Sequence, residues 1–265
     1  IMLLKGKFQN GRSGERTRKL LVVVQYTASM ILLCGTLIVF AQLNYMRRQS
    51  LGVRTDRILV VKFPGPTEGM KIKMEAMRKA IRKLPLVSKV TCSGSVPGEE
   101  VAMFLSNRRT HDALKQNRLY EMLSCDPDYM DAYGLELVAG RGFSEDYGDD
   151  VNKLVINETA ARTLGYTDYE SVIGEEISVE TIEEPMQVIG VVKDYHQQAL
   201  NRNYTPIMLF HKDKIDWIPQ RYISIVMKPG DSLELVSQIS EIWTTYFADS
   251  SFDYFFLDQF YDCLL

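Results

Sequence analysis

The chain has 265 residues, of which 46% are hydrophobic and 25% are charged, and its formal net charge is −3 at pH 7. The charge is divided unevenly, because the first 48 residues hold 8 of the 31 basic residues and 1 of the 34 acidic ones. The rest of the chain therefore carries 23 basic and 33 acidic side chains, a net charge of about −10. Nucleic-acid phosphates would repel so acidic a region, which argues against a nucleic-acid partner.

An apolar run without a charged residue extends from Leu20 to Leu43, between basic flanks. As a helix its 24 residues would span about 36 Å, and the hydrocarbon core of a bilayer is about 30 Å thick. We therefore predict one transmembrane helix at residues 20–43. A cleaved signal peptide is the alternative, but its apolar core normally has about 7–15 residues, and no small-x-small site follows Phe40.

The basic residues predict the orientation of this helix. Six Lys/Arg residues and one acid precede it, whereas two to four basic residues follow it. Because cytoplasmic flanks carry the excess of Lys and Arg, the bias favours a cytoplasmic linker at residues 1–19. Residues 44–57 then form a juxtamembrane stalk, and residues 58–265 form an extracytoplasmic domain.

The domain begins with a pattern typical of a strand, a helix and a second strand. Residues 58–63 are predicted to form a buried strand that stops at Pro64-Gly65-Pro66. Apolar residues then recur every three or four positions from Met70 to Leu84, as on one face of a helix, and residues 87–96 follow as a strand. The other face of this helix is basic. We interpret it as a solvated face rather than a site for an anionic partner.

The C-terminal end repeats this plan. Residues 222–227 alternate like a strand, and Asp231 with Glu234 has capping-box spacing at the start of an amphipathic helix. The aromatic run at 252–257 is typical of a further strand packed in a core. Two β-α-β units can share one sheet with both helices on one face, which predicts an α+β domain rather than a doubly wound sheet.

Short strands, turns and small helices are expected between the two units. The predicted strands are 118–125, 153–156, 176–179, 186–192 and 206–210, and the predicted helices are 128–133 and 157–164. We interpret residues 97–211 as a mixed α/β subdomain inserted into an outer subdomain formed by residues 58–96 and 212–265.

The sequence lacks the familiar patterns of catalytic and metal sites. It has no G-x-x-x-x-G-K-[ST] phosphate loop, no H-E-x-x-H motif and no G-x-S-x-G elbow. Its histidines, His111, His196 and His211, stand far apart, and Gly140-Arg141-Gly142 is too short for a dinucleotide fingerprint and more typical of a tight turn. The four cysteines form no C-x-x-C pair, so no zinc or redox site is assigned. Cys92, Cys125 and Cys263 would allow one disulfide, and free buried thiols are the equal alternative. We predict no catalytic, cofactor-binding or metal-binding residues.

Lys193-Asp194-Tyr195-His196 is the densest cluster of titratable residues, and it directly follows an apolar strand. These residue types can perform acid–base chemistry. We interpret the cluster instead as a strand-exit turn with exposed polar side chains, and we assign it no catalytic role.

Eight segments match one family in order and spacing from one end of the chain to the other. They are LKGKF (4–8), RKLLVVVQ (18–25), QLNYM (42–46), LGV (51–53), AGRGF (139–143), VINE (155–158), VIGVVKDYH (188–196) and FLDQF (256–260). Through them the chain resembles the FtsX-like/MacB-like permease subunits of ABC transporters, especially the two-repeat permeases of Gram-negative bacteria.

The resemblance implies a MacB-like periplasmic core domain in an inner-membrane permease. In that family a separate ATPase subunit binds and hydrolyses ATP, so no cofactor is expected on this chain. The implied partners are that ATPase subunit, the lipid bilayer, the other repeat or a second permease copy, and periplasmic proteins. The resemblance also implies that a first repeat precedes residue 1 and that three spans follow Leu265. It does not identify a substrate.

If the chain transmits motion, the residues that join its helix to its domain matter most. We place the span ends at Leu20 and Leu43, and the coupling stalk at Ser50, Leu51 and Gly52, with the helix expected to end at Gly52. The alternative function is a membrane-anchored extracytoplasmic sensor domain of a signalling receptor. A membrane-tethered enzyme is a third possibility that the absent motifs disfavour.

Overall fold

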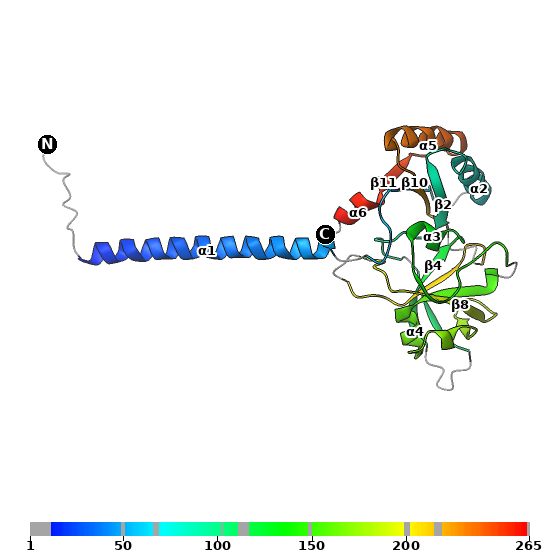
Figure 1. The fold of residues 1–265 in the computed structure, drawn as a ribbon, viewed down its shortest axis with the longest axis horizontal. Helices are drawn as coiled ribbons and strands as arrows, with labels where there is room; N and C mark the ends of the chain where they lie inside the picture. The colour runs from blue at the N-terminus through cyan, green and yellow to red at the C-terminus, as the bar shows by residue number, and fades with distance from the viewer. Residues whose placement is uncertain are drawn as a thin grey trace. The chain divides into compact units, whose positions relative to one another are not determined.

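The structure, a computed structural model, describes residues 12–48, 51–65, 69–101, 103–110, 117–147, 150–198, 202–214 and 219–263. The chain divides into two compact units, Ile1–Gln49 and Ser50–Leu265. The second unit holds the mixed sheet and the remaining helices (Figure 1).

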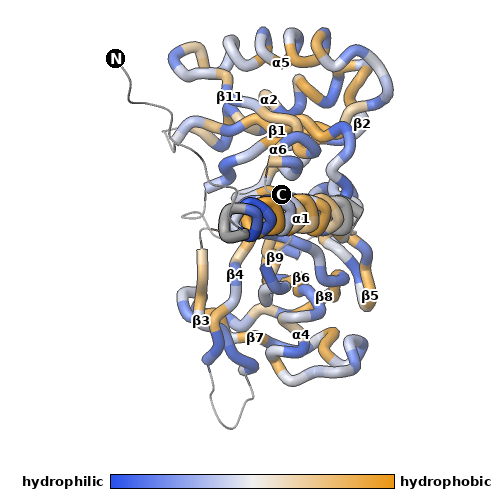
Figure 2. The backbone as a smooth tube through the Cα atoms, turned by 90° about the vertical axis from the view of Figure 1, so that its left-hand side faces the viewer, coloured by the Kyte–Doolittle hydropathy of each residue, from blue (hydrophilic) through white to orange (hydrophobic). Residues whose placement is uncertain are grey.

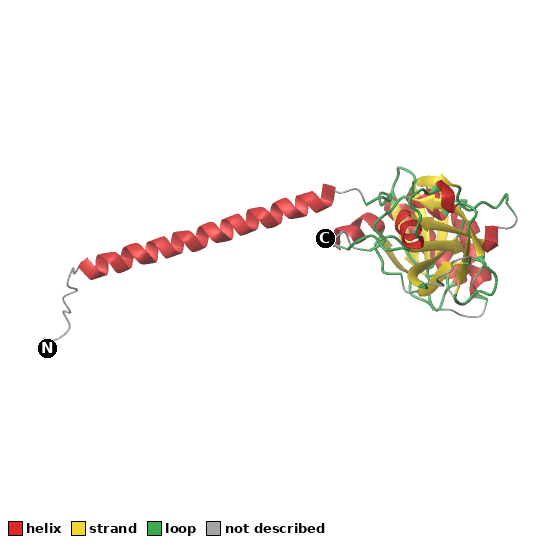
Figure 3. Cartoon of the chain, turned by 90° about the horizontal axis from the view of Figure 1, so that it is seen from below, coloured by secondary structure: helices red, strands yellow, loops and turns green. Residues whose placement is uncertain are grey.

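The first unit contains one long helix, α1 (Arg12–Arg48), which Figure 3 shows as an uninterrupted helix. Within the described residues, Glu15–Gln42 is the helix that is long and apolar enough to cross a membrane. Large hydrophobic side chains are exposed on it, as a lipid-facing helix requires. The helix extends beyond both predicted span ends, Leu20 and Leu43, and the side chain of Leu43 lies outside the described residues.

Four strands form one end of the sheet in the second unit, in the order β11 (Asp253–Phe256), β1 (Ile58–Lys62), β10 (Tyr222–Met227) and β2 (Val87–Ser93). Each neighbouring pair is antiparallel. The two strands of each β-α-β unit are therefore parallel to each other and separated by a strand of the other unit, a split arrangement. This confirms the predicted α+β domain with two units sharing one sheet.

The helices of the two units, α2 (Met70–Ile81) and α5 (Ser232–Tyr246), cover the same face of these strands (Figure 1). Hydrophobic and hydrophilic residues alternate along α5, as an amphipathic helix requires (Figure 2). The Asp231 carboxylate caps α5 by accepting hydrogen bonds from the backbone N–H groups of Leu233 and Glu234, at 2.9 and 3.4 Å.

Alternation along β1 separates two core clusters. Leu59 and Val61 pack under the two helices, whereas Ile58 and Val60 face the opposite cluster. This second cluster also contains residues from the middle of the chain, such as Leu123 and Tyr195, so it joins both ends of the sheet.

The sheet continues from β2 through a single residue pair, Ser93 with Cys125. The further strands are β3 (Phe104–Arg109), β4 (Arg118–Cys125), β5 (Leu137–Gly140), β6 (Lys153–Asn157), β7 (Glu176–Val179), β8 (Met186–Val192) and β9 (Ile207–His211). The shorter helices are α3 (Tyr129–Tyr133), α4 (Glu158–Leu164) and α6 (Leu257–Cys263), with 3-10 turns at Asp150–Asn152 and Glu170–Val172.

Most predicted elements are confirmed within one or two residues, but three were missed. β3 is rich in polar residues, β5 has only four, and α6 follows β11 without a turn residue between them. The predicted first helix ends at Ile81 rather than Leu84, and the predicted strand at 87–96 ends at Ser93. The division into an inserted subdomain at 97–211 and an outer subdomain stays a prediction.

Candidate functional site

The first described residues of the second unit are bound into its fold rather than forming a separate stalk. The carbonyl oxygen of Leu51 accepts a hydrogen bond from the His196 N–H at 3.0 Å, and the Arg54 N–H donates to the Tyr133 carbonyl at 2.7 Å. The side chains of Leu51 and Val53 pack against the cluster that joins both ends of the sheet. Leu51 is therefore an anchor point of the domain.

Gly52 brings the backbone close to the loop that follows β8. Its φ is +74°, and a Cβ added there would lie 3.0 Å from the Asp194 oxygen and from Tyr195 Cα and Cβ. Only glycine accepts both this conformation and this approach without strain. The helix α1 ends before Leu51, so the prediction that it ends at Gly52 is wrong, and Ser50 lies outside the described residues.

The last helix of the domain reaches the same loop. The Tyr261 hydroxyl on α6 donates to the His196 carbonyl oxygen at 2.8 Å, and Tyr261 and Leu257 are buried. Phe260 and Phe255 pack beside them with ring centroids 4.9 Å apart. His196 thus holds the first segment through its N–H and the last helix through its carbonyl.

We name residues 51–54, 194–197 and 257–261 the terminal junction. Its central loop, residues 194–197, is also hydrogen-bonded to the segment at 96–99 and to the start of α4. The Gln197 side-chain amide donates to the carbonyl oxygens of Val96 and Glu99 at 2.8 and 2.9 Å, and Gln197 is 2% exposed.

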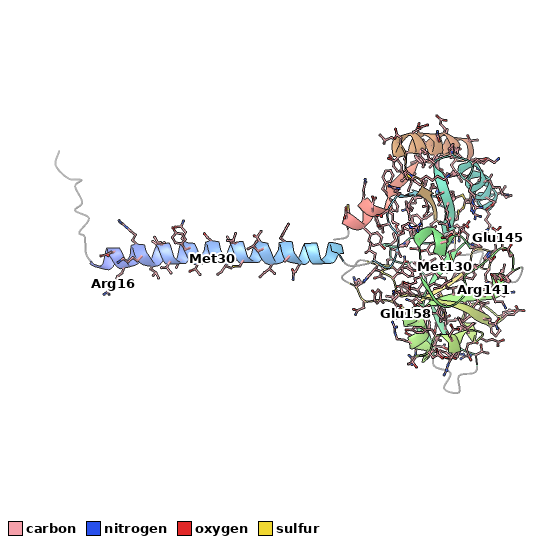
Figure 4. All side chains as sticks on the ribbon, viewed as in Figure 1. Arg16, Met30, Met130, Arg141, Glu145 and Glu158 are labelled. Carbon is pink, nitrogen blue, oxygen red and sulfur yellow. The ribbon has the colours of Figure 1, made fainter. Side chains whose placement is uncertain are left out.

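Asp194 ties the loop to the start of α4. Its carboxylate accepts from the backbone N–H and the hydroxyl of Thr159, each at 2.8 Å, and forms an ion pair with Arg162. Its own N–H donates to the Glu158 carboxylate at 3.0 Å (Figure 4 labels Glu158). The carboxylate therefore acts as an additional cap for a helix that Asn157 also caps.

The prediction of an exposed polar turn at Lys193–His196 is wrong for its two central residues. Tyr195 is 1% exposed because it packs in the core cluster, and Asp194 is 9% exposed because its carboxylate is bonded to Thr159 and Arg162. Lys193 is exposed and pairs with Glu136 at 3.0 Å. The ring of His196 lies 4.6 Å from that of Tyr204, and burial lowers the pKa of His196 from its usual 6.5. The imidazole is therefore neutral at pH 7.

The other residues considered from the sequence are not brought into this site. His111 lies outside the described residues, and the half-buried His211 lies against Phe143, with 6.0 Å between ring centroids. Gly140 has the left-handed conformation of a tight turn, and Arg141 beside it forms a bidentate pair with Asp150, at 2.7 and 2.8 Å. Among the described residues, no group of three or more His, Cys, Asp or Glu is arranged to hold a metal ion.

Three of the eight segments that carried the resemblance meet at the terminal junction. LGV at 51–53 contributes the anchor, VIGVVKDYH at 188–196 the loop, and FLDQF at 256–260 most of the last helix. Sequence reasoning named the first as the coupling stalk but missed Gln197 and Tyr261. Their partners are backbone carbonyls that are distant in sequence, so no local pattern marks them.

The comparisons with known proteins give the family. Residues 28–241 match the MacB-like periplasmic core domain, and the chain belongs to this family. It is thus a MacB-like periplasmic domain of an ABC-type transporter permease, joined to an apolar helix. No curated protein matches the chain.

Three solved structures share its fold. The periplasmic region of MacB from Actinobacillus actinomycetemcomitans is 15% identical with a TM-score of 0.54, and the match covers 80% of this chain and 94% of that one. A domain of a putative permease from Porphyromonas gingivalis is 21% identical with a TM-score of 0.52, over 76% and 89%. The extracellular domain of the ABC-type transporter YknZ from Gram-positive bacteria is 16% identical with a TM-score of 0.52, over 74% and 97%.

Proposed function

We propose that this chain relays motion between its transmembrane helix and its periplasmic domain, driven by ATP hydrolysis in a separate ATPase subunit. The observation that carries the proposal is the double anchorage of His196. The segment that enters the domain and the helix that ends it are both bonded to this one residue. A displacement of either segment therefore acts on the same loop, the one that contains His196.

The short connection between helix and domain supports this role. Arg48 is the last residue of α1, and Leu51 is already bonded to the domain. Three peptide units separate them, and at about 3.3–3.6 Å per residue they reach at most about 11 Å. A movement that takes the end of the helix farther than this from Leu51 must therefore move Leu51 or break its contacts.

The loop can pass the displacement onward because its contacts are buried and directional. Asp194 connects it to α4, and Gln197 connects it to the segment at 96–99. Each such hydrogen bond contributes about 0.5–1.5 kcal/mol, and those to charged groups about 1.5–3 kcal/mol. Together they favour movement of the loop and its partners as one body.

The test is a flexible Gly-Ser insertion between Ser50 and Leu51 in the complete transporter. Because loop insertions cost little stability, the domain should remain folded while transport is lost or ATP hydrolysis becomes uncoupled from it. The matched control is the same insertion between Glu183 and Glu184, in the exposed turn between β7 and β8. Full transport with the first insertion would contradict the proposal.

We further propose that the N-terminus is cytoplasmic and that residues 53–265 are periplasmic, at the inner membrane. The basic flank before α1 and the acidic domain after it support this orientation. After Cys34 and Cys263 are replaced by serine, Asp146→Cys should react with an impermeant reagent on intact cells whose outer membrane is permeabilised, and Arg12→Cys should not. The reverse labelling would overturn it.

A further inference from the structure

A pocket of about 760 Å³ lies beside α2 and shares no residue with the terminal junction. Its walls come from the end of β1, the first turns of α2, strand β2, and the segments after β9 and before β10. This volume is within the range of about 300–1,000 Å³ that is usual for small-molecule sites. Residues 66–68 and 215–218, near these walls in sequence, lie outside the described residues and are not part of the site.

One side of the pocket is apolar. Phe63, Met70 and Met74 contribute side chains that are 5–9% exposed, and Cys92 lies among them. Burial raises the pKa of the Cys92 thiol, so it stays protonated and behaves as a small apolar group. Ile72 is 78% exposed and also lines the pocket. Flexible methionines can adapt to the shape of an apolar ligand.

The pocket has more basic than acidic residues, whereas the domain around it is acidic overall. The pocket includes five basic residues and two acidic ones, although the chain beyond residue 48 has a net charge of about −10. The basic residues are Lys62, Lys71, Arg78, Lys212 and Arg221, and the acidic ones are Glu75 and Asp213. Glu75 pairs with Arg78 at 3.4 Å and Asp213 with Lys212 at 3.3 Å, so the pocket keeps a net positive charge that attracts ligands of the opposite sign.

Two buried polar atoms on the wall have no hydrogen-bond partner among the described residues, Arg78 Nε and Gln220 Oε1. The Arg78 side chain is 4% exposed. Its Nη2 contacts Asp128 at 2.8 Å and Asp126 at 3.3 Å, and its Nη1 contacts Glu75 at 3.4 Å. Its Nε–H is therefore a fixed, buried donor that still requires an acceptor. Because this atom is buried, an anionic oxygen in the pocket would reach it only after a movement of the Arg78 side chain.

We propose that this pocket binds a small amphipathic anion, an apolar chain with one anionic headgroup. The chain would lie on Phe63, Met70 and Met74, and the headgroup at the basic residues of the rim, such as Lys62 and Arg221. The basic face of α2, interpreted from sequence as solvated, is then in part the rim of a binding site. Its volume and apolar wall favour a small molecule over an acidic protein segment.

The test uses the full chain in lipid nanodiscs with a medium-chain fatty acid that carries a photoreactive diazirine. Mass spectrometry locates the label on peptides that cover residues 62–82. The corresponding alcohol, which lacks the charge, is the second probe. We expect the acid to label these peptides roughly tenfold more than the alcohol, which corresponds to about 1.4 kcal/mol of headgroup interaction.

A pair of matched variants distinguishes binding in the pocket from nonspecific binding to the protein surface. Ile72→Glu places a negative charge at the rim, whereas Leu233→Glu changes a side chain on α5 that is 74% exposed and outside the pocket. Labelling should fall roughly tenfold with the first and stay unchanged with the second, and both should fold because both sites are exposed.

Four results would overturn the proposal. Equal labelling by acid and alcohol would show that the charge has no role, and equal labelling of the two variants would show that the pocket has none. Label confined to α1 would show partition into the bilayer only. Cross-linking of Lys62 or Lys212 to an acidic protein, without fatty-acid labelling, would assign the pocket a different occupant.

Discussion

Replacing Gly52 by alanine tests the geometry of the terminal junction directly. Two costs add at this position. An L-residue in the left-handed conformation loses about 1–2 kcal/mol, and φ is +74° here. The new Cβ would also lie 3.0 Å from three atoms of Asp194 and Tyr195, two of them backbone atoms, and such overpacking costs about 1–3 kcal/mol.

The expected loss for Gly52→Ala is therefore about 3 kcal/mol. For a domain of about 150–250 residues, each kcal/mol lowers Tm by about 2–4 °C, so Tm should fall by about 6–12 °C. Thermal unfolding of a protein that contains residues 51–265, followed by circular dichroism, measures this shift.

Gly165→Ala is the matched control. Gly165 has φ +96° but no atom within 4 Å of an added Cβ, so alanine there incurs only the conformational cost. The difference between the two variants isolates the contact with the loop. If Gly52→Ala were no more destabilising than Gly165→Ala, the close approach of Gly52 to Asp194 and Tyr195 would be refuted.

Three further predictions concern side chains near the junction. Asp194→Ala should lower the free energy of unfolding by about 2–4 kcal/mol, and Asp194→Asn by less, in urea titrations, because alanine leaves the Thr159 N–H without its partner. His196→Ala should keep most of the transport activity, because the backbone of His196, and not its ring, bonds to Leu51 and Tyr261; loss of transport in a folded variant would contradict this. Burial raises the pKa of Glu121 above its usual 4.5, so the folded state binds this proton more tightly than the unfolded state does. The resulting stabilisation is complete below pH 4.5 and is lost as the pH rises through the raised pKa. Glu121→Gln should therefore raise the urea midpoint at pH 8 and change it little at pH 4. A lower urea midpoint for this variant at pH 8 would show that the buried carboxylate does not destabilise the folded state.

Local patterns in the sequence determined the elements whose signal is short-range. The uncharged run at 20–43 predicts a helix that is long and apolar enough to cross a membrane, and the three-to-four spacing from Met70 predicts the buried face of α2. The continuous apolar run at the start of residues 58–63 predicted a buried strand, and the burial of both faces of β1 agrees with it. These features need no knowledge of the rest of the chain.

Only the tertiary structure decided how the two β-α-β units interleave and what the Lys193–His196 cluster does. Strand order depends on pairings such as Ile58 with Val226, which a local pattern cannot encode. Asp194 and Tyr195 are polar or amphipathic, so composition favoured exposure, but long-range partners bury them. The same holds for Tyr261 and Gln197, whose acceptors are backbone carbonyls elsewhere in the chain. Every residue has such a carbonyl, so an acceptor of this kind leaves no trace in the amino-acid sequence.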